Sequence, residues 1–151
     1  MSTLEPRVTL EVEQAAREII ACGVRAPGVW DKIKHVRPEW FTHWSDQVLW
    51  RAIQYAYEQN GGFEVNVVLR WLREYCRADA DALLDRLANI AEAYLHAEFV
   101  DFYLGTLERS GERLAVQRWA GHVAEMCGSG RSMSDICEVV SSPPIRSGGV
   151  A

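Results

Sequence analysis

The chain has 151 residues and a mass of 17.1 kDa, which is the size of one ordinary domain. Its 48% hydrophobic and 25% charged residues exclude wholesale disorder, and a net charge of -5 opposes a strong independent hold on nucleic acid. No apolar run approaches the roughly 20 residues that span a bilayer and the N-terminus lacks the regions of a signal peptide, so we expect a soluble cytoplasmic protein without membrane binding.

Apolar residues recur at intervals of three and four along most of the chain, which predicts an all-α fold. The helices expected in chain order are about Leu10–Cys22, Pro27–Val36, Ser45–Asn60, Asn66–Cys76, Asp79 or Asp81 to Tyr94, Ala97–Cys127 and Met133–Val140. We expect a compact helical bundle over residues 1–96 and a long arm helix with a short return helix over 97–140. A flexible tail should follow over 141–151, because this end is rich in Gly, Ser and Pro.

Helix ends are predicted from capping residues and helix breakers. Thr9, Ser45 and Asn66 are candidate N-caps, because short polar side chains accept bonds from the first free amides of a helix. Ser132 or Ser134 is the candidate cap of the last helix. Gly23 should lie just behind the first helix, and Asn60-Gly61-Gly62 should end the third, since glycine adopts the left-handed conformation readily.

The long segment Ala97–Cys127 would measure about 45 Å as one continuous helix. Its glycines make it weak in isolation, so packing must hold it. Four apolar residues share one face, three aromatic residues flank that face and a glycine allows close approach of a partner helix; they are Val100, Leu104, Leu107 and Leu114, then Phe99, Tyr103 and Trp119, and Gly111. We expect this stripe to be an interface with a second copy or another protein; the alternative is that it folds back as ordinary core.

A search for reactive chemistry finds no strong motif. Neither Lys32 nor Lys34 follows the glycines that a phosphate-binding loop requires, so we expect no nucleotide or other cofactor. The four cysteines lack metal-site spacing and are expected to be buried free thiols. The acid and histidine pairs Glu92 with His96 and His43 with Asp46 do not form the motifs of a di-metal centre. We therefore expect neither a metal site nor catalysis. The six tryptophans are expected to be core or interface anchors rather than a stacking platform for bases.

Several motifs in order resemble the N-terminal collar domain of DnaB-type bacterial replicative DNA helicases. Glu11-Val12-Glu13-Gln14-Ala15-Ala16, with Ile19-Ile20, is similar to the opening of that domain's first helix. Pro38-Glu39-Trp40-Phe41 and the following helix over residues 47–53 are similar to its Phe-containing loop and next helix. Gly62-Phe63-Glu64-Val65-Asn66 resembles its Gly-x-Pro-Val-Asp turn, and Ala97–Cys127 lies where the family has its arm helix.

The resemblance covers about residues 8–140 and has departures. Asp46 stands where the family commonly has His, and Arg17-Glu18 replaces a common Leu-Gly. The return helix Met133–Val140 is short for the antiparallel hairpin through which the family's domain dimerises.

The resemblance implies a scaffold without catalytic residues that self-associates, supports a helicase collar and binds primase or a helicase loader. An alternative is a free-standing regulator, encoded by a phage or mobile element, that binds a host helicase, primase or loader. A coding region that continues beyond Ala151 into a Gly-Lys-Thr/Ser motif would favour the first reading. A helical enzyme and an unrelated adaptor are further alternatives.

Overall fold

The computed structural model describes residues 5–142. It contains seven α-helices and no strand within that range, which confirms the all-α prediction. The α-helices are α1 (Glu5–Arg25), α2 (Trp30–Ile33), α3 (Trp44–Asn60), α4 (Val65–Tyr75), α5 (Ala80–Ala93), α6 (Val100–Gly128) and α7 (Met133–Val140). Single turns of 3-10 helix occur at Pro27–Val29, Pro38–Trp40, Arg77–Asp79 and Ala97–Phe99. None of the described helices is long and apolar enough to cross a membrane.

The chain forms two compact units, residues 1–108 and 109–151, and their boundary falls inside α6. The division expected after residue 96 falls at the 3-10 turn Ala97–Phe99, which precedes α6. Most of the tail expected over 141–151 lies outside the described residues.

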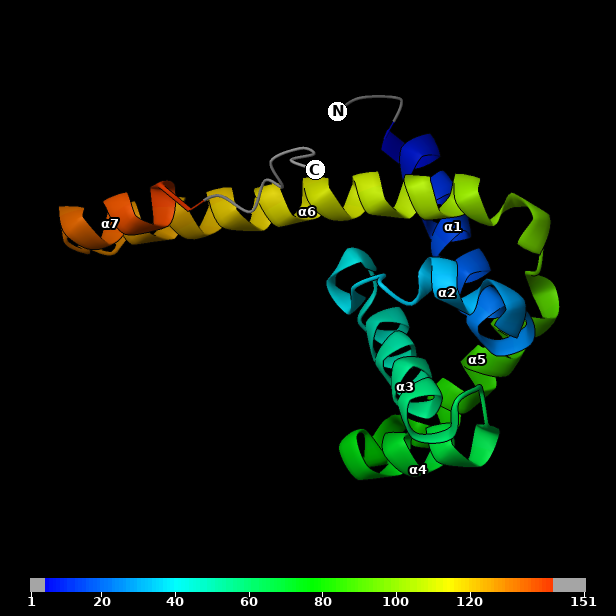
Figure 1. The fold of residues 1–151 in the computed structure, drawn as a ribbon. Helices are drawn as coiled ribbons and strands as arrows, with labels where there is room; N and C mark the ends of the chain where they lie inside the picture. The colour runs from blue at the N-terminus through cyan, green and yellow to red at the C-terminus, as the bar shows by residue number, and fades with distance from the viewer. Residues whose placement is uncertain (1–4, 143–151) are drawn as a thin grey trace. The chain divides into compact units, whose positions relative to one another are not determined.

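The first unit has one core, around which α1, α3, α4 and α5 pack (Figure 1). Helix α1 contacts both α5 and α3, and α4 contacts α3 and α5. Ile19 and Ile20 of α1, Leu49 and Ile53 of α3 and Leu87 of α5 are almost wholly excluded from water. Burial of each such side chain stabilises the fold by roughly 1.5–3 kcal/mol. Because these side chains recur with helical spacing, each helix has one apolar face, and these faces pack together.

Aromatic rings fill the space between α2, α3 and the loop that joins them. Trp50 is completely buried, and its Nε1 donates a hydrogen bond of 2.8 Å to the carbonyl of Val36. Trp30 stacks on Tyr57 with ring centroids 3.7 Å apart, and Phe41 lies against Trp50. These rings are core, as expected for most of the tryptophans, whereas the neighbouring Trp44 is 56% exposed.

The observed helix ends confirm some capping predictions. Gly61 ends α3 in the left-handed conformation, with φ of 71° and its N–H bonded to the carbonyl of Tyr57. Ser132 caps α7, because its hydroxyl accepts a bond from the backbone N–H of Asp135.

Other predicted ends were wrong. Helix α1 begins at Glu5 and continues to Arg25, so Thr9 and Gly23 lie inside it. The buried Gly23 permits close packing, since a Cβ there would lie 3.1 Å from Ile53. Helix α3 begins after His43, so Ser45 belongs to its first turn and does not cap it.

Two further elements differ from the expected helices. Glu64 caps α4 in place of Asn66: its Oε1 accepts a hydrogen bond of 3.2 Å from the backbone N–H of Asn66. The segment expected as one helix over Pro27–Val36 consists of a 3-10 turn followed by the four-residue α2.

Candidate interaction surface

The first part of α6 belongs to the first unit and uses its inward face to complete that unit's core. Val100 is 3% exposed and Leu107 is fully buried, while Tyr103 and Leu104 pack half-buried against the same core. This half of the predicted stripe is therefore covered by the chain itself. Burial of these four residues explains how a helix with poor intrinsic propensity is held in place.

The outward face of the same segment carries two exposed phenylalanines. Phe99 is 54% exposed at the end of the 3-10 turn that precedes α6, and Phe102 is 67% exposed in the first turn of α6. Their spacing of three places them on one side of this helical segment. The Phe102 ring meets the edge of the Tyr103 ring at a centroid distance of 5.6 Å. Phe102 was missed by the sequence reasoning because it lies outside the predicted stripe, although exposed aromatic residues are typical of protein interfaces.

The connection that leads into α6 is fixed to α1 by a buried carboxylate. Glu18 is 0% exposed and accepts two hydrogen bonds from His96, one of 2.9 Å from the backbone N–H and one of 2.7 Å from ring Nδ1. The hydrogen bond and the charge of Glu18 raise the pKa of His96. Glu18 appeared in the sequence only as a departure from the family pattern, and its partner lies 78 positions away.

The second unit contains a helical hairpin formed by the end of α6 and α7. The indole Nε1 of Trp119 donates a bond of 2.9 Å to the carbonyl of Val139, and Met126, on the same side of α6, is 5% exposed. Because Trp119 is well before the end of α6 and Val139 is near the end of α7, the two helices run antiparallel, as Figure 1 shows.

Helix α7 leaves an apolar face uncovered. Ile136 and Val139 are half-buried, whereas Met133 is 72% exposed and Val140 is 46% exposed. Cys137 is also exposed, and its spacing from Met133 and Val140 places all three on one side of the helix. These three residues are called the α7 stripe below.

The remaining predicted interface residues lie in the second unit. Gly111 is buried, and Leu114 and Trp119 are half-buried. The eight residues expected to share one interface thus divide between the core of the first unit, its exposed surface and the second unit.

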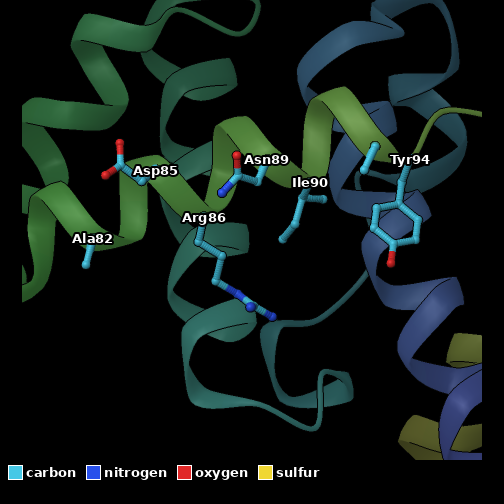
Figure 2. A pocket seen from close by; sticks show the side chains of 7 residues that line it. Ala82, Asp85, Arg86, Asn89, Ile90 and Tyr94 are labelled. Atoms are coloured by element: carbon cyan, nitrogen blue, oxygen red, sulfur yellow. The ribbon is translucent and has the colours of Figure 1, made fainter.

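An ion pair between α3 and α5 was also missed. Asp46 is 2% exposed, and its Oδ1 accepts bonds of 3.1 and 2.8 Å from Nε and Nη2 of Arg86. Arg86 also lines a shallow hollow of about 480 Å³ on α5, together with Asn89, Ile90 and Tyr94 (Figure 2). The sequence suggested only that Asp46 would favour the start of α3, since the forty positions to Arg86 hide the pairing.

Of the four cysteines expected to be buried, Cys22 on α1 is buried, whereas Cys76 is half-buried and Cys127 and Cys137 are exposed. Burial and the nearby charge of Glu18 raise the pKa of Cys22 to about 11, so its thiol is protonated at neutral pH and is a poor nucleophile. Among the described residues, no group of three or more His, Cys, Asp or Glu side chains is arranged to hold a metal ion. His43 instead lies 2.9 Å from Glu13.

No family model and no curated protein matches the chain. The arrangement of exposed apolar side chains is therefore the main source for a functional proposal. Both the phenylalanine pair and the α7 stripe present groups that gain free energy when a partner removes them from water.

Proposed function

We propose that this chain is an assembly and protein-interaction domain of the kind found at the N-terminus of DnaB-type replicative helicases. It acts without turnover: it self-associates through the α6–α7 hairpin and offers a second surface to a primase or a helicase loader during DNA replication. The activity of any longer parent protein would reside outside this domain.

The observation that carries the proposal is the hairpin with its uncovered α7 stripe. The resemblance implies an antiparallel pair of helices after the long arm helix, and Trp119 and Val139 join such a pair here. Met133 and Val140 remain exposed, so association of two hairpins would bury apolar surface that the single chain leaves in water. The short α7 limits the contact and favours a reversible assembly.

The phenylalanine pair supports the second part of the proposal. Phe99 and Phe102 are held on a helix whose inner face is locked in the core, so little conformational entropy is lost when a partner covers them. Aromatic anchors of this kind commonly carry much of the binding energy at an interface.

Analytical ultracentrifugation of the wild-type chain and the double variant Met133→Glu/Val140→Glu tests the assembly role. We expect the wild type to self-associate reversibly and the variant to be a monomer with unchanged helicity, because the charges fall on a face that is exposed in the single chain. Tyr75→Glu is the matched control, since Tyr75 is 64% exposed on α4 and lies outside the hairpin. A wild type that is monomeric at about 0.5 mM would defeat the self-association claim.

Binding of purified primase and helicase loader tests the partner role by calorimetry. We expect Phe99→Ser/Phe102→Ser to weaken binding of one of them by about tenfold or more, with self-association unchanged. A regulator of a host helicase would instead bind the complete helicase. Indifference of the wild type to all of these proteins would contradict the proposal.

A further inference from the structure

An apolar groove of about 340 Å³ lies beside α5, and none of its lining residues belongs to the α6–α7 hairpin. It is lined by apolar side chains from the end of α1, the loop before α4, the start of α4 and one side of α5: Val24, Phe63, Val65, Leu84, Ala88 and Ala91. Asp85 is the one charged residue among those described along its walls. A groove with so few polar groups cannot orient a small polar ligand, but it suits the apolar side chains of a peptide helix.

A row of carboxylates follows one edge of this groove. Asp81, Asp85 and Glu92 are spaced four and seven positions apart on α5, so they lie along the same side of the helix as Ala88. All three are exposed, and none forms an ion pair with another described residue. The three carboxylates therefore form a negatively charged row, without ion-pair partners among the described residues, beside the apolar side chains that line the groove.

Neither Arg25 nor Arg86 forms an ion pair with this row of carboxylates. Arg25 donates a hydrogen bond of 2.9 Å to the carbonyl of Ala91, where it complements the negative end of α5. Arg86 pairs with Asp46, at 2.8 Å, and forms no ion pair with the neighbouring Asp85. A further carboxylate belongs to Glu64, which caps α4 and lies in the sequence between the lining residues Phe63 and Val65.

From this geometry we infer that the groove binds a basic amphipathic helix of another protein, with its apolar side chains between Phe63 and Leu84 and its Lys or Arg side chains along Asp81, Asp85 and Glu92. Apolar burial supplies affinity, and the carboxylate row selects the sign of the partner's charge. A second copy of this chain is disfavoured because each copy carries a net charge of -5. The inference does not depend on assembly through the hairpin.

Three synthetic helical peptides test the inference. The first has leucines at helical spacing flanked by lysines, the second has glutamate in place of every lysine, and the third has alanine in place of every leucine. Binding to the isotope-labelled full chain is followed by amide chemical shifts, and affinities are measured by fluorescence anisotropy. We expect only the first peptide to bind well, to shift the amides of Val24, Phe63 and Ala88, and to bind more weakly as salt rises.

Two variants separate the apolar and the charged contributions. Ala88→Trp places a large ring in the groove from an exposed helical position, and it should weaken the first peptide about tenfold without unfolding the chain. Asp81→Lys/Asp85→Lys/Glu92→Lys should weaken the first peptide by a similar factor and strengthen the glutamate peptide. The triple variant Glu58→Lys/Glu74→Lys/Glu112→Lys makes the same change in net charge at exposed positions elsewhere and should behave like the wild type for both peptides.

Several results would overturn the inference. These are the absence of binding by the lysine peptide, equal binding of the lysine and glutamate peptides, and binding that Ala88→Trp leaves intact. Shifts of the groove amides when the protein alone is concentrated would assign the groove to a second copy instead. Because Ala88→Trp should not alter sedimentation of the chain, failure here is distinguishable from failure of the hairpin proposal.

Discussion

Removal of Arg86 tests how the buried Asp46 holds α3 against α5. In Arg86→Met, the Asp46 carboxylate loses both of its arginine donors while remaining 2% exposed. Breaking a buried ion pair in this way commonly costs about 3–5 kcal/mol, and the Arg86 side chain is one-third exposed, so we expect about 3 kcal/mol. For a domain of this length, that loss lowers the melting temperature by roughly 6–12 °C.

Urea unfolding followed by circular dichroism at neutral pH measures this cost. Arg73→Met on α4 is the matched control and should change the free energy of unfolding by less than about 0.5 kcal/mol, because Arg73 is exposed. The double variant Asp46→Leu/Arg86→Met removes the orphaned charge and should return to within about 1 kcal/mol of the wild type. A loss under about 1 kcal/mol in Arg86→Met, or a double variant no more stable than the single one, would refute the reasoning.

Two further predictions concern pH and the turn after α3. The hydrogen bond and charge of Glu18 raise the pKa of His96 above its ordinary value of 6.5, so the stability that this pair adds is fully present below pH 6.5 and is lost as pH rises through the folded-state pKa. The excess stability of the wild type over His96→Gln, measured by urea unfolding, should therefore shrink as pH rises, and a pH-independent difference would contradict this. Gly61→Ala should lower the free energy of unfolding by about 1 kcal/mol, because φ is 71° there. Gly62→Ala should cost less in the same urea unfolding experiment, because Gly62 has no positive φ; equal losses would contradict the conformational argument.

The helices were predictable because apolar periodicity records which face of each helix is buried. Ile19, Leu49 and Leu87 all lie inward, as their spacing indicated, and the limits of α7 were predicted residue for residue. Helix starts were less predictable, since several polar residues near each start can cap a helix and only the three-dimensional chain path selects one. At α4 the capping residue is Glu64. Its side chain accepts a hydrogen bond from the backbone N–H of Asn66, the kind of free N–H that a shorter capping side chain usually binds.

The candidate surfaces were predictable only in part, because periodicity identifies an apolar face but not what covers it. The predicted stripe along α6 is regular in sequence, yet Leu107 lies in the chain's own core while Leu114 belongs to another compact unit. Because the chain's own core covers part of the stripe, the candidate partner contacts are residues that break the pattern. These are Phe102, next to the half-buried Tyr103, and Met133, on a helix too short to show a clear repeat. A charged substitution at Leu107 would therefore destroy the fold before it could report on assembly, whereas one at Met133 perturbs only surface that is already in water.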